Sequence, residues 1–320
     1  MRNNKKNNFA LNTKILFVFC AISFSQAFAQ HYSLYSNYIN NGLVINPAFA
    51  GRNEGLDATM LHRRQWTGMN GAPVTTSFSV SSPLKLKSMN LGISIVDERI
   101  GGTMNQNVNG IYAYRFKSGS MNCSFGLQAG FLVGRTDWSK LRRNDSGDEL
   151  LEGQSKTMTA FTSGAGYYMY NQLFFLGVSL PYLVNTNSLK SVANGPIVFN
   201  AGYLFELKDS SAIKPSLLIR LTPGSPISYD LNISYAYKQK YALGLSYRRQ
   251  ESVVAILEIP IQKQIKIFYS YDFGMGPVKK YHNGSHEIML RYLLFKSPEE
   301  KKPEEVKPDE SKPIEGGGGQ

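Results

Sequence analysis

The first candidates for metal binding or catalysis in this chain are its four histidines, His31, His62, His282 and His286. His282 and His286 are four residues apart, which is the spacing of a metal-binding pair on one face of a helix. Asn283 and Gly284 lie between them and disfavour a helix, and Glu287 is the one carboxylate beside the pair. The sequence therefore predicts no metal site.

A nucleophilic site is the second possibility, because Ser285 lies next to His286 and invites comparison with membrane-embedded lipases. Nothing in the sequence fixes a nucleophile, a base and an orienting residue together. The Gly274-x-Gly276 pair lacks the third glycine and the helix of a dinucleotide site, and there is no phosphate-binding loop. We predict a protein that is not an enzyme and that uses no cofactor.

The stretch at residues 226–238 indicates what kind of element carries these side chains. Its apolar and polar residues alternate at every second position, which predicts a strand with one apolar and one polar face. Its length matches the roughly 9–11 residues that a tilted strand needs to cross a bilayer, and its tyrosines suit the membrane interface. A strand of a soluble sandwich would look the same, so the rest of the chain must decide.

The same alternation recurs along the chain and predicts about 14 strands, an even number as in single-chain outer-membrane barrels. The predicted strands are residues 56–66, 74–82, 90–97, 108–117, 121–133, 157–170, 173–180, 197–207, 213–221, 226–238, 241–248, 252–260, 264–273 and 286–295. Beyond the N-terminus there is no apolar run of the length that a membrane-spanning helix needs. The predicted fold class is all-β, a transmembrane antiparallel β-barrel.

The connections between the predicted strands alternate in length. The odd-numbered ones are long and include residues 66–73, 98–107, 134–156, 181–195 and 274–285. The even-numbered ones are tight and include residues 117–120, 171–172, 208–211 and 238–240. Long extracellular loops that alternate with short periplasmic turns are the pattern of outer-membrane barrels, and a sandwich gives no reason for it. An even strand count then places both chain ends in the periplasm.

Charged residues fall on the polar faces of the predicted strands. They are Arg115, Arg220, Arg248, Arg291, Glu206, Glu258 and Glu287. A salt-bridged barrel lumen explains them, and a substrate path is the alternative. The formal net charge of +12 has a basic excess that is scattered and not clustered, so we predict contact with membrane lipid and no nucleic-acid partner.

The chain divides into four segments. Residues 1–29 have a basic start, an apolar core and an Ala27-Phe28-Ala29 cleavage motif, which predicts a signal peptide. Residues 30–55 are not strand-like and would fit a plug or a periplasmic brace, and residues 56–295 form the barrel. Residues 296–320 are charged and proline-rich, which predicts a disordered periplasmic tail. Cys123 is the only cysteine outside the signal peptide, so no internal disulfide is expected.

Several short motifs, together with their spacing, resemble the PorP/SprF family of Bacteroidota outer-membrane proteins. The residues that carry the resemblance most specifically are Asn46, Pro47, Ala48, Gly51, Arg63, Arg64, Gln65, Trp66, Gly71, Ala72, Pro73, Asp97, Gly101, His286 and Glu287. The resemblance covers residues 32–102 and the closing strand, whereas the middle of the chain matches only in its strand pattern.

The resemblance implies an outer-membrane barrel that works with the type IX secretion system. Some members belong to the secretion and gliding machinery and touch its periplasmic ring, whereas others secrete a large adhesin and hold it at the cell surface. It implies no catalysis, and it implies structural roles for Trp66 as an anchor, Gly71 and Pro73 as turn formers, and Asn46-Pro47 as a brace. The alternative hypothesis is a FadL-like channel for hydrophobic solutes, whose family also has an Asn-Pro-Ala segment before the barrel.

Overall fold

The computed structural model describes residues 35–137, 156–185, 195–238 and 240–295. Its elements are α2 (Gly42–Ile45), η1 (Pro47–Phe49), β1 (Gly55–Arg64), β2 (Val74–Pro83), β3 (Met89–Ile100), β4 (Thr103–Ser118), β5 (Met121–Thr136), β6 (Lys156–Tyr170), β7 (Phe174–Asn185), β8 (Ile197–Tyr203), β9 (Phe205–Glu206), β10 (Ala212–Leu221), β11 (Ser228–Tyr237), β12 (Tyr241–Arg248), β13 (Ser252–Pro260), β14 (Ile265–Gly274), η4 (Pro277–Tyr281) and β15 (Ser285–Phe295). The predicted signal peptide and the predicted tail lie outside the described residues.

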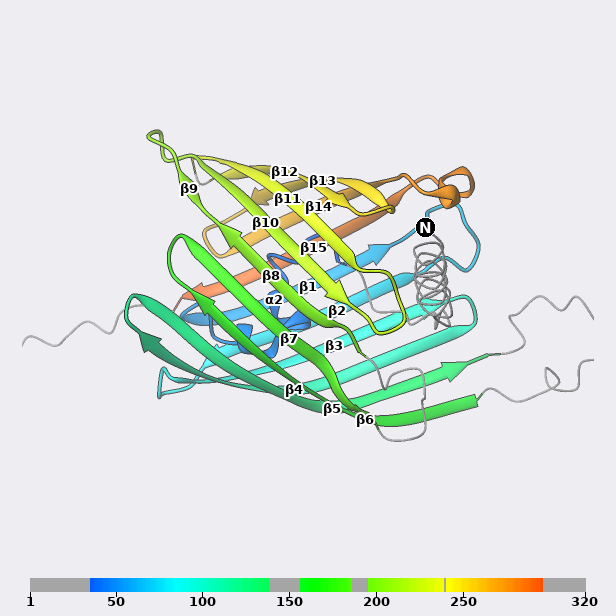
Figure 1. Ribbon diagram of the computed structural model, residues 1–320, viewed down its shortest axis with the longest axis horizontal. Coiled ribbons are helices and arrows are strands. Elements are labelled where there is room, and N and C mark those ends of the chain that lie inside the picture. The colour runs from blue at the N-terminus through cyan, green and yellow to red at the C-terminus, as the bar shows by residue number, and fades with distance from the viewer. Residues whose placement is uncertain (1–34, 138–155, 186–194, 239, 296–320) are drawn as a thin grey trace, which may run out of the picture.

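The strands form one antiparallel sheet that closes on itself (Figure 1). Each strand pairs with its neighbours in chain order, and β15 pairs with β1 along their whole length, from Gly55 opposite Phe295 to Arg64 opposite His286. The predicted strand at residues 197–207 is interrupted at Leu204, so β8 and β9 are two pieces of one strand. The barrel therefore has 14 strands, which confirms the predicted fold class.

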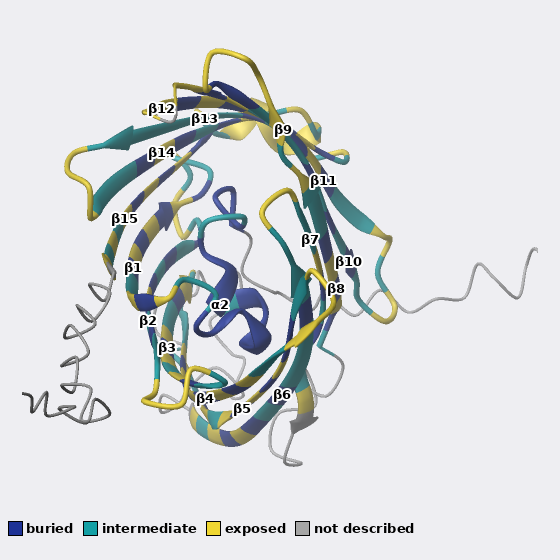
Figure 2. Ribbon diagram, turned by 90° about the vertical axis from the view of Figure 1, so that its left-hand side faces the viewer, coloured by how far each residue is buried: buried dark blue, intermediate teal, exposed yellow. Residues whose placement is uncertain are grey.

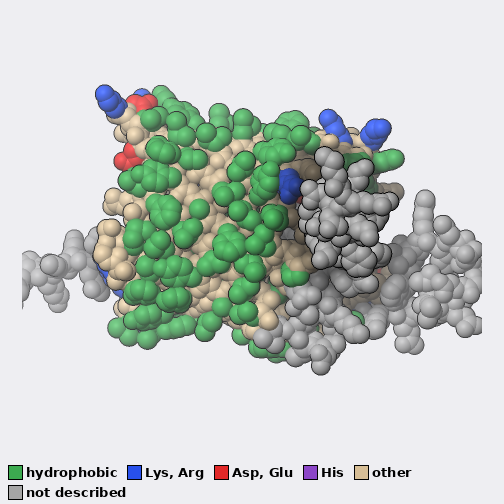
Figure 3. Space-filling view, viewed as in Figure 1, with side chains coloured by type: hydrophobic (Ala, Val, Ile, Leu, Met, Phe, Trp, Pro, Cys, Tyr) green, Lys and Arg blue, Asp and Glu red, His purple; other side chains and the backbone are tan. Residues whose placement is uncertain are grey.

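The outer wall of the barrel is apolar. On β11 and β12 the outward side chains include Ile233, Tyr235, Leu243 and Leu245, and Leu243 is 64% exposed. Figure 3 shows such hydrophobic side chains over one face of the wall, with charged side chains towards its ends. Exposure of this many large apolar side chains suits a surface that lipid covers and that water does not. No helix of the described residues is long and apolar enough to cross a membrane.

The two ends of the barrel differ in their connections. The short-turn end has brief turns such as residues 119–120 between β4 and β5, whereas the long-loop end has residues 65–73 and 275–284. The predicted long connection at residues 98–107 is wrong, because β3 and β4 pair up to a turn of Gly101 and Gly102. Polar side chains on both faces made this ladder resemble a loop. The interiors of the predicted connections 134–156 and 181–195 are mostly outside the described residues, and β5 and β7 extend into them.

Residues 35–51 form a segment inside the barrel, which we call the plug. Figure 2 shows α2 enclosed by the ring of strands. Tyr38, Ile45 and Ala48 are 1%, 2% and 2% exposed, so the plug is buried along its length. It runs from the long-loop half of the lumen to the short-turn end, where β1 begins. The buried core of the protein lies between the plug and the inner faces of the strands.

Candidate functional site

A network of buried charges crosses the long-loop half of the lumen. Its core is a pair of carboxylates held by one arginine: the Arg63 guanidinium lies 2.6 Å from Asp272 and 3.2 Å from Glu287. The side chains of Arg63 and Glu287 have no exposed surface, and that of Asp272 is 3% exposed. Strands β1, β14 and β15 supply these three residues from lumen-facing positions in neighbouring register.

The network continues across the lumen to three further strands. Arg248 lies 3.2 Å from Asp272 and 3.2 Å from Asp230, and Arg220 lies 3.0 Å from Asp230. Every one of these side chains is at most 5% exposed. Burying a charge is costly unless opposite charge and hydrogen bonds accompany it, and here three buried arginines face three buried carboxylates, with the partly exposed Glu251 3.4 Å from Arg248 at the edge. The network is therefore balanced, and removing any one member leaves an uncompensated charge.

The plug is part of this network through its first residues. The backbone amides of Ser36 and Asn37 donate to the two oxygens of Glu287 at 2.9 and 2.8 Å, and the Asn37 side chain donates to the same carboxylate at 2.8 Å. The Ser36 hydroxyl donates to Asp272 at 2.9 Å and accepts from Arg63 at 2.8 Å. Charge-assisted hydrogen bonds of this kind are stronger than neutral ones. We call this set of contacts the latch.

Tyr38 extends the latch towards β10. Its hydroxyl lies 3.2 Å from that of Ser216, and the ring is 1% exposed. Burial raises the pKa of the Tyr38 phenol well above its ordinary value, so the hydroxyl stays neutral and able to donate.

The other end of the plug rests on glycines of the inner wall. A Cβ atom added at Gly126 of β5 would collide with the backbone of Pro47 and Ala48, and one added at Gly166 of β6 would collide with Asn46. The Asn46 side chain caps η1 by accepting from the amide of Ala48 at 2.9 Å. It also donates to the carbonyl of Tyr167 at 3.1 Å. Small residues in the wall thus let the plug backbone approach the sheet closely.

Aromatic packing closes the short-turn end of the plug. The Phe49 and Tyr168 rings meet edge to face with centroids 5.5 Å apart. The Arg52 guanidinium lies 5.2 Å from the centre of the Phe49 ring and 5.4 Å from that of Tyr168, which is cation–π distance. Arg115 donates to the carbonyl of Gly51 at 2.7 Å. The plug is therefore fixed at both ends by different chemistry: charge-assisted hydrogen bonds to buried carboxylates at one end and aromatic and cation–π contacts at the other.

The four consecutive residues from Arg63 to Trp66, which we call the RRQW motif, lie in three different environments. Arg63 points into the lumen and joins the latch, whereas Arg64 is exposed on the outer face. Gln65 is 2% exposed. Its backbone amide donates to the carbonyl of Pro73 at 2.9 Å, and this hydrogen bond closes the loop at residues 65–73. Trp66 has a positive φ of 45°, and its amide donates to the Ser285 hydroxyl at 3.1 Å.

The remaining motif residues of the first three strands lie near this loop. Gly71 accepts from the amide of Gly101 at 2.9 Å, so the loop between β1 and β2 touches the turn between β3 and β4. Both glycines have positive φ, 73° and 56°, and a side chain would strain them. Ala72 precedes Pro73 in the same loop. Asp97 lies on the outer face of β3, where it pairs with Arg99 at 3.0 Å.

The structure also answers the two chemical possibilities raised by the histidines. The Ser285 hydroxyl faces inward, whereas His286 is on the outer face of β15, 2.7 Å from the hydroxyl of Tyr269. The two side chains therefore do not form a nucleophile–base pair. His282 lies beside Trp66 with ring centres 6.2 Å apart. Within the described ranges no group of three or more His, Cys, Asp or Glu residues could hold a metal ion.

Sequence reasoning predicted a salt-bridged lumen, and the ion pairs confirm it. Of the charged residues that it named, Arg220, Arg248 and Glu287 join the buried charge network, Arg291 pairs with Asp57 at 2.8 Å, and Glu258 pairs with Lys266 at 2.6 Å. Among the described residues, Arg115 forms no ion pair and donates instead to the carbonyl of Gly51, and Glu206 is exposed without an ion pair. It missed Asp230 and Asp272 as partners, and it missed Ser36 and Asn37 of the plug. The two aspartates carried a signal, since each is an acid on the polar face of a predicted strand.

A closed, even-stranded antiparallel barrel with an apolar outer wall, a charged lumen and an internal plug is the architecture of an outer-membrane barrel protein. The family comparison identifies which kind. The profile described as "Type IX secretion system membrane protein PorP/SprF" matches residues 27–292, and the chain belongs to this family.

Several solved structures resemble this chain over most of its length. Omp33 of Acinetobacter baumannii is 8% identical, with a TM-score of 0.45 over 76% of this chain and 100% of that chain. The toluene transporter TbuX of Ralstonia pickettii is 9% identical, with a TM-score of 0.47 over 78% of this chain and 92% of that chain. Outer membrane phospholipase A of Escherichia coli is 12% identical, with a TM-score of 0.38 over 76% of this chain and 98% of that chain. A comparison with curated protein sequences gives no match.

Proposed function

We propose that this protein is a non-enzymatic outer-membrane component of the type IX secretion and gliding system. In this role it assists the secretion or surface anchoring of a cargo protein, or contacts the periplasmic ring of the machinery. Its family membership supports the secretion role. Its partners would be outer-membrane lipid, ring or peptidoglycan-linked secretion components, and a large secreted surface protein.

The latched plug is the observation that carries this proposal. A conduit needs a path through the lumen, but the plug occupies the lumen and is fixed at Glu287 by three hydrogen bonds and at Asn46 by the inner wall. A plugged barrel is suited to hold partners at its rims, since a site on packed scaffold elements is held more precisely than one on loops alone. We therefore propose a docking platform and not a pore.

The topology gives the proposed platform an orientation. β1 begins and β15 ends at the short-turn end, which we assign to the periplasm because outer-membrane barrels turn tightly there. The plug starts in the opposite half, where Arg248 donates to the carbonyl of Tyr35 at 3.4 Å. If the signal peptide is removed after residue 29, the five residues before Tyr35 span at most about 18 Å. The new N-terminus would then stay close to the plug, whereas the C-terminal tail would enter the periplasm.

A FadL-like channel for hydrophobic solutes is the alternative hypothesis. A cavity of about 470 Å³ lies at the short-turn end of the lumen, between strands β9 to β14. Lys214, Lys266 and Glu258 line it, together with Lys240 at the rim. Charged walls bind an apolar solute poorly, because its entry would desolvate the charges without pairing them. The described cavity therefore gives the channel hypothesis no support.

The test is a mild-detergent purification of the protein from its native outer membrane, with mass spectrometry of what accompanies it. Co-purification of a large surface protein or of periplasmic ring components supports the proposed role. A purification from the same membranes with an untagged chain is the control. Recovery of the protein without partners, together with flux of hydrophobic solutes into liposomes, would replace the proposal with the channel.

A further inference from the structure

Three arginines on the outer wall lie in one register row near the long-loop end. Arg64 of β1 is paired with Val74 of β2, and Val74 is paired with Arg99 of β3. Arg99 is paired with Met104 of β4, and Met104 with Arg135 of β5. Neighbouring strands are about 4.8 Å apart, so the row presents an arginine about every 10 Å. We call Arg64, Arg99 and Arg135 the arginine row.

The arginine row faces away from the lumen and is accessible. All three residues are exposed, and the side chain of Arg99 is 62% exposed. On the same strands, the large exposed apolar side chains nearest to the row on its short-turn side are Met60, Ile95 and Phe131, which are 54%, 40% and 58% exposed. The row thus lies just beyond the apolar wall, at the height where a bilayer changes from hydrocarbon to headgroups.

Acidic side chains offset only part of this charge. Asp97 accepts from Arg99 at 3.0 Å and from Gln106 at 3.2 Å, and it lies one step closer to the apolar wall. Asp137 follows Arg135 by two residues along the chain. Exposed His286 of β15 is paired with Arg64 and extends the row by one strand. Among the described residues, three arginines and two carboxylates therefore lie at this level, and the row keeps a net positive charge.

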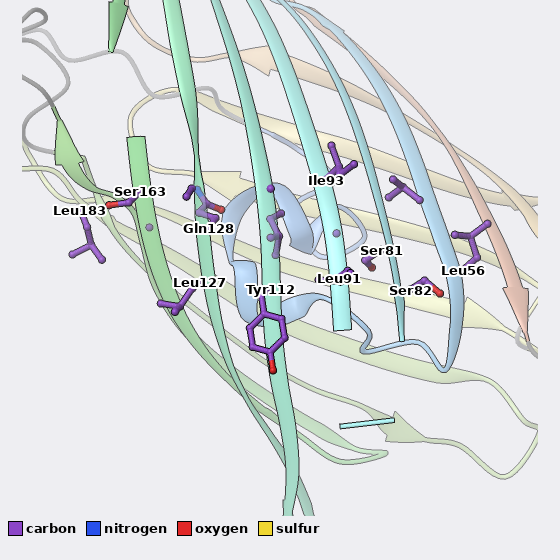
Figure 4. A pocket seen from close by; sticks show the side chains of 16 residues that line it. Leu56, Ser81, Ser82, Leu91, Ile93, Tyr112, Leu127, Gln128, Ser163 and Leu183 are labelled. Carbon is purple, nitrogen blue, oxygen red and sulfur yellow. The ribbon is translucent and has the colours of Figure 1, made fainter. Parts of the chain in front are cut away.

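A hollow of about 770 Å³ indents the outer wall of the same strands (Figure 4). Leu91, Ile93, Tyr112 and Leu127 point into it, whereas the plug lies on the other side of the strands. The hollow exists where side chains are small: Gly110 lies beside Ile93 in one register row, and Ala129 follows Gly110. This apolar depression has the chemistry of an acyl-chain site.

The depth of the hollow fits a lipid whose headgroup is bound at the arginine row. Ile93 lies six residues from Arg99 along β3, about 20 Å of strand. At a tilt of about 45° this corresponds to roughly 14 Å of depth, close to half of a hydrocarbon core about 30 Å thick. The chain ends of a lipid in the outer leaflet would therefore reach the hollow.

We propose that the outer face of β1–β5 binds a phosphorylated lipid of the outer leaflet. Arg64, Arg99 and Arg135 contact the phosphate groups, because guanidinium groups match phosphate oxygens with paired hydrogen bonds. The spacing of the row favours a headgroup with more than one phosphate. The acyl chain ends occupy the hollow beside Gly110 and Ala129. This inference rests on the outer-membrane orientation, but it does not depend on a secretion partner.

The experiment titrates diphosphoryl lipid A into the full-length protein in nanodiscs and measures retained lipid by native mass spectrometry. Its comparison variants are R64Q/R99Q/R135Q and, as a control with the same charge removed, K85Q/K87Q/R249Q. Lys85 and Lys87 are exposed at the short-turn end, and Arg249 contacts the carbonyl of Ile227 away from the row. Heat-modifiable migration on gels verifies that each variant is a folded barrel.

The row variant is expected to bind roughly 100-fold more weakly, at about fivefold for each arginine near the surface of a charged membrane. The control variant should bind as the native chain does. Asp97→Asn is expected to strengthen binding by about fivefold, since it frees Arg99 for phosphate. Gly110→Leu fills the hollow and should weaken binding while the preference for phosphorylated lipid persists.

Two further ligands test whether the protein recognises phosphate groups as part of a lipid. Lipid A without its phosphates and with the same acyl chains should bind roughly 100-fold more weakly. Inorganic phosphate should fail to compete at millimolar concentration. Equal binding of the dephosphorylated lipid would overturn the proposal, and so would equal loss in the control variant or effective competition by free phosphate. Failure of the native-membrane purification to recover secretion partners would leave these results unchanged.

Discussion

Replacing Glu287 with alanine is expected to loosen the plug without unfolding the barrel. Glu287 accepts three hydrogen bonds from Ser36 and Asn37 and pairs with Arg63, and its side chain is fully buried. Removing one partner of a buried ion pair costs about 3–5 kcal/mol, because the remaining charge is left uncompensated. The paired strands keep their ladders, so this cost falls mainly on the seating of the plug.

The reactivity of a cysteine on the lumen wall can report whether the plug is in place. Ser79 of β2 is 3% exposed and lies beside Asn41 and Leu43 of the plug. In a background with Cys123→Ala, Ser79→Cys should react with a water-soluble maleimide only when the plug moves away. At about 1.4 kcal/mol for each factor of ten, Glu287→Ala should accelerate labelling roughly 100- to 4,000-fold.

The matched control is Glu258→Ala, which also removes a lumen carboxylate. Its partner Lys266 has a side chain that is 42% exposed, so the loss should be under about 1 kcal/mol and the acceleration under about fivefold. Labelling of the Glu287→Ala chain within about threefold of the native rate would refute the latch. Equal acceleration in both variants would show a general loosening of the lumen and would refute it as well.

Three other outcomes are expected. Gly126→Leu should displace η1, because its side chain would occupy the space of Pro47 and Ala48. It should lower the melting temperature more than Gly110→Leu, whose side chain would face outward and whose Cβ atom would have only the carbonyl oxygen of Ala129 nearby, at 3.8 Å. The two melting curves check it. Protease added to intact cells should cut between residues 137 and 156 and spare the turn at residues 119–120, and a cut at that turn would reverse the proposed orientation. The protein should migrate faster on gels before heating than after, as the closed β1–β15 seam requires, and identical migration would contradict a closed barrel.

The sequence predicted the barrel because the membrane imposes a local rule. Every outward position opposite hydrocarbon must be apolar, so β11 and β12 show their faces directly in the alternation of residues such as Leu231, Ile233, Leu243 and Leu245. The rule ends at the headgroups. Asp97 and Gln106 face each other in a paired ladder, but their polarity made this part of β3 and β4 resemble a loop. The presence of each strand could thus be predicted, whereas the distance that a strand extends beyond the bilayer could not.

The path of the plug could not be predicted, because its contacts join residues far apart in the chain. Ser36 meets Asp272, and Asn46 meets the carbonyl of Tyr167, and no local pattern encodes either pair. The acids Asp230 and Asp272 were visible as polar-face residues, but their partners depend on how the barrel closes. Glycines such as Gly126 gave a weak signal, since a glycine within a strand often marks a close backbone approach.

The RRQW motif illustrates how one short sequence serves several parts of the molecule. Because side chains of a strand alternate, consecutive residues of β1 cannot act at the same place. Arg63 therefore pairs with Glu287 and holds the plug, whereas Arg64 begins the exposed row that we assign to lipid phosphate. The chain then leaves the strand, and Trp66 ties the loop to β15 through Ser285. Two single substitutions test that division. Arg63→Gln should loosen the plug and leave lipid binding intact, whereas Arg64→Gln should weaken lipid binding and leave the plug in place.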